Sequence, residues 1–145
     1  PIDVGIGISQ IIPVVVSCLA PFRGLRLIEQ PELHLHPRVQ CELADLFIET
    51  MWFTEDYLDS YPRTYLIETH SEHLLLRLKR RIREGFEKSL PKGKSGLTKE
   101  DLAIYYVNEN PKGEIEFTRI RVDDRGDFIE IWPEGFFGER AEEIF

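Results

Sequence analysis

The sequence has 145 residues, of which 42% are hydrophobic and 30% are charged, and its net charge is −8. This length supplies one hydrophobic core and is too short for two well-formed ones. The negative charge argues against a chain that binds nucleic acid over its whole surface, because that affinity comes mostly from Lys and Arg side chains that meet phosphates. No apolar run approaches the roughly 18 residues of a membrane span, so we expect a cytoplasmic protein without a membrane partner.

The first element expected along the chain is a glycine-rich loop, residues 3–10, that leads into a mostly buried helix over residues 11–19. Ser9 suits the N-cap of that helix. Gly5 and Gly7 precede the helix, where exposed backbone N–H groups and the helix dipole attract an anion. A tight turn without a ligand is the alternative interpretation of such a loop. Because the sequence lacks an initial Met and opens directly on this loop, we expect it to be the back part of a longer polypeptide.

The next stretch, residues 25–37, is an apolar run that stops abruptly at carboxylates and imidazoles. Such a run with an acid at its carboxyl end predicts a buried parallel strand that delivers the acid to the edge of a sheet, where open α/β proteins bind ligands. A helix that covers the sheet is expected from Pro37 to about residue 58, because apolar residues recur there at three- and four-residue steps. A second strand, residues 63–68, again ends on an acid.

The C-terminal half predicts a helix, a loop and a hairpin. Ser71 is the expected N-cap of a helix that runs to about residue 86. Residues 87–96 are rich in Lys, Gly, Pro and Ser, which is typical of a flexible loop. Strands over residues 102–107 and 115–122 flank a turn and are expected to pair as a hairpin.

An aromatic tail follows the hairpin. We expect its rings to dock on the rest of the protein; they are Phe128, Trp132, Phe136, Phe137 and Phe145. We therefore place a first domain over residues 1–110 and a small hairpin-and-tail extension, packed on it, over residues 111–145.

Basic residues and cysteines receive structural interpretations. Lys and Arg concentrate between residues 77 and 99, where a solvated helix face and tail is favoured over a binding patch. Cys18 and Cys41 have no ligand-like spacing and lie in apolar helical patterns, so we expect buried, reduced thiols.

Two strand-end clusters share one pattern of acids and imidazoles. Their members are Glu29, Glu32, His34 and His36 at the first strand, and Glu68 and His70 at the second. Adjacent parallel strands would bring their carboxyl ends within about 5 Å of each other. In one interpretation a carboxylate holds Mg²⁺ beside a phosphate chain, a polar group orients water, and a histidine donates to the phosphoryl oxygen under attack. In the other, Glu and His bind zinc directly and the metal activates water.

Three motifs resemble those of a known family. Residues 27–37, LIEQPELHLHP, resemble the extended Walker B segment of SMC-like and ABC-type ATPases of the AAA group, including relatives of the overcoming-lysogenization-defect proteins. Residues 68–71, ETHS, resemble the switch-histidine loop of these ATPases, and residues 3–10, DVGIGISQ, resemble their signature loop. The hairpin and the tail resemble a small C-terminal domain of one group among them. The resemblance implies an α/β fold, the C-terminal lobe of a P-loop NTPase of ABC or SMC type, with parallel strands flanked by helices.

The resemblance also implies roles for single residues. Glu29 matches the Walker B acid that holds Mg²⁺ through water. Gln30 stands where most relatives carry the catalytic glutamate, and a glutamine can orient the attacking water but cannot accept its proton. Glu32 is the nearby carboxylate that would take the role of base. His70 matches the switch histidine that contacts the γ-phosphate of ATP.

The signature loop of this family acts on the nucleotide of a partner subunit. The resemblance therefore assigns nucleotide contacts in trans to Gly5, Gly7, Ser9 and Gln10, and it implies a homodimer arranged as a head-to-tail ATP sandwich. In ABC proteins a serine precedes the glycine pair, whereas here the glycines come first. Gly5 and Gly7 are therefore favoured over Ser9 as phosphate contacts.

The sequence contains no G-x-x-x-x-G-K-[ST] loop, which in such ATPases cradles the phosphates and supplies a lysine. We therefore expect a missing Walker A lobe as a partner, and we expect the isolated chain neither to bind ATP tightly nor to hydrolyse it. Relatives are coupled to DNA repair, phage defence or a fused nuclease, so DNA or a nuclease is a further partner to consider.

Two alternatives to the ATPase interpretation stay open. The first is a non-catalytic interaction module with a degenerate nucleotide site, and Gln30 is the residue that supports it. The second is a zinc-dependent hydrolase. His34 and His36 are separated by one residue and followed by a proline, beside leucines that look structural. For these two histidines a structural role near the site is favoured over a catalytic one.

Overall fold

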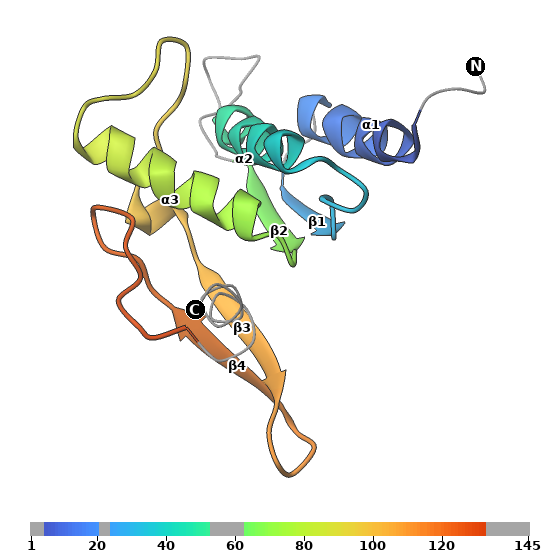
Figure 1. Cartoon of the computed structure of the whole chain (residues 1–145), viewed down its shortest axis with the longest axis vertical. Coiled ribbons are helices and arrows are strands. Elements are labelled where there is room, and N and C mark those ends of the chain that lie inside the picture. The colour runs from blue at the N-terminus through green and yellow to red at the C-terminus, as the bar shows by residue number, and fades with distance from the viewer. Residues whose placement is uncertain (1–4, 21–23, 53–62, 133–145) are drawn as a thin grey trace, which may run out of the picture. The chain divides into compact units, whose positions relative to one another are not determined.

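The computed structural model describes residues 5–20, 24–52 and 63–132 of the chain. These residues form a mixed α/β structure with a parallel two-stranded sheet and an antiparallel hairpin (Figure 1). The predicted α/β class is confirmed. None of the helices within the described ranges is long and apolar enough to cross a membrane.

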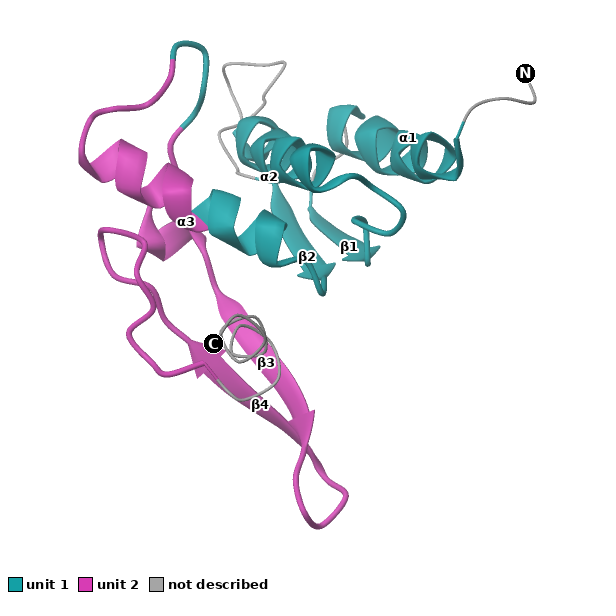
Figure 2. Cartoon of the chain, in the orientation of Figure 1, with its two compact units in different colours: residues 1–78, 92–95 teal, residues 79–91, 96–145 magenta. Residues whose placement is uncertain are grey.

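The chain divides by its internal contacts into two compact units (Figure 2). Unit 1 comprises Pro1–Leu78 and Lys92–Ser95, and unit 2 comprises Lys79–Pro91 and Gly96–Phe145. The predicted domain boundary after residue 110 stays a prediction, and it falls in the turn between the two paired strands of the hairpin.

Unit 1 contains two parallel strands and the helices packed on them. Its elements are α1 (Ile6–Leu19), β1 (Leu25–Glu29), α2 (Pro37–Met51), β2 (Thr64–Glu68) and the first turns of α3 (Glu72–Phe86). The strands pair in register from Leu25 opposite Thr64 to Glu29 opposite Glu68. Both strands therefore end at the same level, each on a carboxylate.

Within the part of the chain that the structure describes, helices cover one face of this sheet and not the other. α1 and α2 lie on the same side of the strands (Figure 1), and α3 is tied to α2 because Arg77 donates to Asp45 at 2.7 Å. On the opposite face the described residues leave Leu25, Leu27 and Leu66 exposed by 54%, 70% and 60%. The prediction of a buried strand is therefore wrong for this chain, since side chains alternate between a covered and an uncovered face.

α1 begins earlier and is less buried than the sequence predicts. It starts at Ile6 with Gly5 as its N-cap, so Ser9 lies in the first turn and does not cap the helix. Glycine serves as an N-cap without a side-chain bond because its backbone readily adopts the non-helical conformation needed there. Only Cys18 is fully buried, because α1 packs along one side. Apolar side chains on its other side are exposed by half or more: Ile6, Ile8, Ile12, Val16 and Leu19. Residues 3 and 4 of the predicted loop lie outside the described residues.

The two other helices begin where the sequence predicts. α2 starts at Pro37, and the Nδ1 atom of His36 caps it by accepting from the backbone N–H two residues later at 3.2 Å. Its last described helical residue is Met51, and the expected end near residue 58 lies outside the described residues. The Oγ atom of Ser71 accepts from the backbone N–H three residues later at 3.0 Å, so the predicted N-cap of α3 is confirmed.

The core of unit 1 is built mainly from α2 and α3. Its buried apolar side chains are Cys18, Leu43, Ala44, Phe47, Ile48, Leu74, Leu75 and Leu78. Burial raises the pKa of the Cys18 thiol, which fits the expected buried and reduced cysteine. Cys41 is only half-buried, and its Sγ atom lies 3.7 Å from the carbonyl oxygen of His73.

A short piece of the predicted flexible loop also belongs to unit 1. The Nζ atom of Lys94 lies 3.3 Å from a carboxylate oxygen of Asp45 and 3.1 Å from one of Glu49. This part of the loop is therefore anchored on α2 by ion pairs.

Unit 2 contains the end of α3, a 3₁₀ helix (Lys99–Asp101), β3 (Ile104–Glu109) and β4 (Ile115–Ile120). β3 and β4 pair as an antiparallel hairpin, which confirms the prediction. Two tail rings dock as expected: Trp132 lies 4.8 Å from Phe128 and 6.3 Å from Tyr106 between ring centroids. The predicted docking of Phe136, Phe137 and Phe145 falls outside the described residues.

The basic stretch of α3 within unit 2 is largely paired. Arg80 donates to Glu84 at 2.6 Å, Arg81 also donates to Glu84, and Arg83 donates to Asp127 at 3.1 Å. The expected solvated helix face is therefore in part a network of ion pairs.

Candidate functional site

The site begins at the carboxyl ends of β1 and β2, where two acids lie side by side. Glu29 and Glu68 are opposite each other in the parallel register, and both are exposed. Their side chains belong to the alternating set that includes Leu27 and Leu66, so they point to the uncovered face of the sheet. The sequence predicts this juxtaposition, and the structure brings the two acids together.

Gln30 extends the pairing of the strands by one residue. Its backbone N–H donates to the carbonyl of Glu68 at 2.8 Å, and its side-chain Nε2 donates to the carboxylate of Glu68 at 3.3 Å. Gln30 has a φ of 42°, a left-handed conformation that costs a residue other than glycine about 1 kcal/mol or more. The chain turns at this strained residue, and the amide of Gln30 stays at the strand end beside Glu68.

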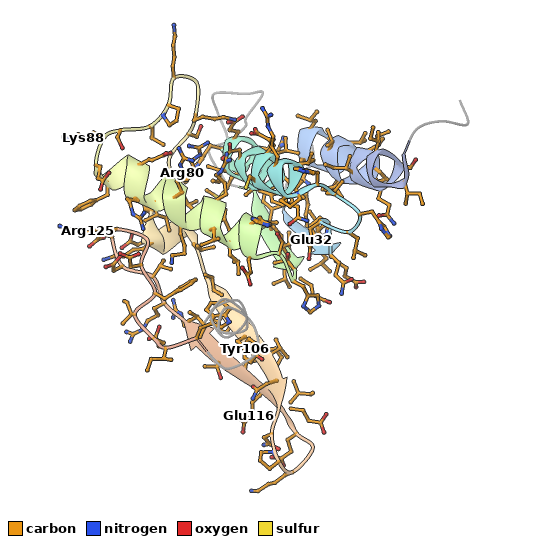
Figure 3. The ribbon with its side chains drawn as sticks, viewed as in Figure 1. Glu32, Arg80, Lys88, Tyr106, Glu116 and Arg125 are labelled. Carbon is orange, nitrogen blue, oxygen red and sulfur yellow. The ribbon has the colours of Figure 1, made fainter. Side chains whose placement is uncertain are left out.

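Glu32 lies near the ends of β1 and β2 (Figure 3). It is 7% exposed, and its Oε1 atom accepts from the backbone N–H of His70 at 2.6 Å. Its Oε2 atom is buried and has no hydrogen-bond partner among the described residues. Glu32 therefore binds the loop after β2 through one oxygen, while its other oxygen faces a position where a donor would be favourable.

The loop that carries His70 is held from several sides. Ser71 donates to the side-chain oxygen of Gln40 at 2.6 Å, and the Nε2 atom of Gln40 donates to the carbonyl of Leu35 at 3.0 Å. These bonds join the loop after β2 to α2 and to the loop after β1. The imidazole of His70 is exposed, so a fixed backbone presents a ring that can reach a ligand.

The two histidines of the first cluster differ from His70. His36 caps α2 through its ring nitrogen, which is the structural role favoured by the sequence. His34 is exposed and has a φ of 59°, and its carbonyl oxygen faces the start of α1. A Cβ atom added to Gly7 would lie 2.5 Å from that oxygen, so only glycine fits at this contact.

The four predicted signature residues all lie at the beginning of α1. Gly5 is the N-cap and Gly7 lies in the first turn, while Ser9 and Gln10 follow in the helix and are exposed. Gly5 has no other atom within 4 Å of an added Cβ, in contrast to Gly7. Their contacts with a nucleotide of a partner subunit stay a prediction.

The carboxylates present suit magnesium. Mg²⁺ is usually held by one or two carboxylates together with substrate phosphates, and Glu29 and Glu68 supply one carboxylate from each strand end. Zinc needs at least three protein ligands from His, Cys, Asp or Glu. Among the residues that the structure describes, no group of three such side chains is placed to hold a metal ion.

Comparison with protein families bears on this arrangement. Residues 2–75, about half of the chain, match the family model of the AAA ATPase domain. The chain belongs to the AAA ATPase domain family. In this AAA ATPase chain the matched segment contains α1, β1, α2, β2 and the start of α3, and thus every predicted site residue.

The second part of the AAA ATPase chain matches another model. Residues 97–145 match the family model described as protein of unknown function (DUF3696), and this match contains the hairpin. No curated protein and no solved structure matches the chain. The family match confirms the expected ATPase relationship, and AAA ATPases as a family use ATP and Mg²⁺.

Two contacts at the site were not predicted from the sequence. These are the bond from the Gln30 amide to Glu68 and the bond from the His70 backbone to Glu32. The only sequence signal for the first was the repeated acid at the ends of two successive strands. The second depends on a turn at residues 30–33 that folds Glu32 inward, and no local sequence pattern predicts that turn.

Proposed function

We propose that the chain is the second lobe of an ATP-binding and ATP-hydrolysing AAA protein of ABC or SMC type. The observation that carries the proposal is the strand-end geometry: Glu29 and Glu68 lie in register on one open face, beside the anchored loop of His70. An exposed acid at a strand end can hold a cation next to phosphates, and an exposed imidazole can donate to a phosphoryl oxygen. The relationship to the overcoming-lysogenization-defect proteins and the Walker B, switch and signature assignments are part of this proposal.

The uncovered face of the sheet is evidence for a further lobe that packs on it. Leu25, Leu27 and Leu66 are more than half exposed on it, and contiguous exposed apolar surface of this kind marks an interaction site. We assign this face to the lobe that carries the Walker A loop, because its apolar patch ends at the two carboxylates where the phosphates would lie. Covering the leucines would complete the second layer of a P-loop sheet.

Each site residue has a proposed role. Glu29 would hold Mg²⁺ through water, and the bound ion would neutralise charge on the phosphate oxygens. Gln30 orients the attacking water, and His70 donates to the γ-phosphate oxygens as negative charge moves onto them. Glu32, the nearby carboxylate expected from the sequence to take the role of base, is buried against the backbone of His70 and is therefore well placed to fix the loop.

The remaining contacts come from a second subunit. Gly5, Gly7, Ser9 and Gln10 would close over ATP bound by the partner in a head-to-tail homodimer. Gly5 and Gly7 lie at the N-terminus of a helix of 14 residues, where unpaired backbone N–H groups and the helix dipole favour an anion. Coupling to DNA repair or phage defence, through DNA or a nuclease, rests on the resemblance alone.

The experiment compares the isolated chain with a polypeptide that joins it to its Walker A lobe. We expect Mg²⁺-dependent ATP turnover only in the joined protein, and loss of most of that turnover in its Glu29→Gln variant. Turnover by the isolated chain would contradict the two-lobe account. No turnover in the joined protein would favour a non-catalytic interaction module, the alternative that the glutamine at position 30 supports.

A further inference from the structure

The glutamine at position 30 leaves the site without a base at its usual place, and the structure offers another acid beside it. We propose that Glu68 is the general base of this site and that Gln30 is its positioning residue. This inference rests on the proposed ATPase function. It replaces the base role that the sequence gives to Glu32.

The first argument is the direct contact of the two side chains. The Nε2 atom of Gln30 donates to the Oε1 atom of Glu68 at 3.3 Å. A glutamate at position 30 would place two carboxylates at this distance, where like charges repel and one of them tends to take up a proton. With glutamine, the pair holds one amide and one carboxylate, and that carboxylate belongs to Glu68 at the end of β2.

The second argument is access to water and substrate. Glu68 is exposed at the end of β2, opposite Glu29, and its backbone carbonyl is fixed by the N–H of Gln30 at 2.8 Å. His70, the proposed phosphate contact, follows two residues later on the same loop. The proposed base Glu68, the hydrogen-bond donor His70 and the magnesium-binding acid Glu29 therefore lie at the same edge of the sheet.

The third argument removes Glu32 from the base role. A base must reach the attacking water, directly or through one further water. Glu32 is 7% exposed, and one of its carboxylate oxygens accepts a hydrogen bond of 2.6 Å from the backbone N–H of His70. Moving it to the water would break that bond and release the loop that positions the imidazole.

The chemical step balances with these groups. As the water oxygen forms its bond to the γ-phosphorus, the Glu68 carboxylate takes one proton from that water. The bond between the γ-phosphorus and the bridging oxygen breaks, and ADP leaves with its electron pair. The proton on Glu68 then passes to the released phosphate or to solvent, which restores the carboxylate.

The main rival role for Glu68 is a second ligand of Mg²⁺. The two roles differ in their dependence on the ion: a lost ligand raises the Mg²⁺ concentration needed for half-maximal turnover, and a lost base does not.

The test uses Glu68→Gln in the polypeptide that includes the Walker A lobe. Glutamine can still accept from the amide of Gln30, so the contact is kept while the proton acceptor is lost. We expect the turnover number to fall roughly 10²- to 10⁴-fold, with ATP affinity and half-saturating Mg²⁺ unchanged. Glu72→Gln, which removes an equal charge from the first turn of α3, is the matched control and should keep wild-type turnover.

A second variant tests the exchange of positions. The double variant Gln30→Glu/Glu68→Gln keeps one amide and one carboxylate in contact, and we expect it to recover to within about tenfold of wild type. A Glu68→Gln variant within about threefold of wild type, or one that extra Mg²⁺ restores, would overturn this inference alone. A wild-type joined protein without any turnover would remove the proposed function together with it.

Discussion

The Oε1 atom of Glu32 accepts a hydrogen bond of 2.6 Å from the backbone N–H of His70, joining the loops that follow two parallel strands. The bond crosses from the loop after β1 to the loop after β2, 38 residues later in the chain. It makes the position of the exposed imidazole depend on a buried carboxylate that never needs to touch the substrate.

Removal of this acceptor should weaken the fold. Glu32→Ala leaves a part-buried N–H without its partner, so we expect the free energy of unfolding of the chain to fall by about 1–3 kcal/mol. Glu32→Gln keeps an acceptor oxygen and should cost less. Urea unfolding of both variants measures the difference, and equal stability of Glu32→Ala and wild type would show that the bond contributes nothing.

The two glycines at the start of α1 should respond differently to the same substitution. In Gly7→Ala the new methyl group would lie 2.5 Å from the carbonyl oxygen of His34, so we expect a loss of about 1–3 kcal/mol despite the better helix propensity of alanine. Gly5→Ala meets no atom within 4 Å and is the matched control, expected within about 1 kcal/mol of wild type. Thermal unfolding compares them, and a Gly7→Ala chain more stable than wild type would refute the close contact.

Acid should destabilise unit 2 through Glu84. Burial favours the neutral carboxyl, but hydrogen bonds from Arg80 and Arg81 outweigh it and hold the pKa of Glu84 below its usual range. A carboxylate with a lowered pKa stabilises the fold above its unfolded pKa of about 4.3, and this stabilisation is lost as the pH falls through the folded value. Glu84→Gln should therefore flatten the fall in stability between about pH 5 and pH 3.

The control for that measurement is Glu87→Gln, which removes an exposed carboxylate one residue beyond α3. We expect its stability profile to follow that of wild type. If the Glu84→Gln chain loses stability in acid as steeply as wild type, the ion pairs of Glu84 are not the source of the pH dependence.

The exposed leucines should matter only when the Walker A lobe is present. In the isolated chain Leu27→Ser and Leu66→Ser change side chains that are 70% and 60% exposed, so we expect stability changes within about 0.5 kcal/mol. In the joined protein each leucine would be buried, and each substitution should cost about 1.5–3 kcal/mol. Ile28→Ser, on the covered face of β1, should destabilise both proteins.

Denaturant unfolding of the isolated and joined proteins measures these differences. Equal effects of Leu27→Ser in both proteins would mean that the Walker A lobe does not cover this face.

Much of the fold could be predicted from residues whose preferences act locally along the chain. Pro37 and Ser71 begin α2 and α3 because proline and serine suit the first positions of a helix, and acids after short apolar runs mark the ends of β1 and β2. The strands themselves are not buried, because the described residues place helices over one face of the sheet and leave Leu25, Leu27 and Leu66 exposed on the other. An apolar run alone does not show which face will be covered.

The details of the site could not be predicted from local sequence patterns. The pairing of Gln30 with Glu68 depends on the register of two strands that are far apart in sequence, and the inward position of Glu32 depends on a left-handed residue at position 30. Glutamine rarely adopts that conformation, so its propensity gives no signal. The early start of α1 depends on Gly5 acting as a cap where the sequence offers the more usual Ser9.

The central claim is that the ends of β1 and β2 form an ATP-hydrolysing site, and His70 tests it most directly. In the polypeptide that includes the Walker A lobe, His70→Ala should lower the ATP turnover number about 10²- to 10³-fold while ATP binding is retained, because the exposed imidazole is the proposed donor to the γ-phosphate. His73→Ala, one turn later on α3, should turn over ATP like wild type. Equal turnover by His70→Ala and His73→Ala would contradict the account.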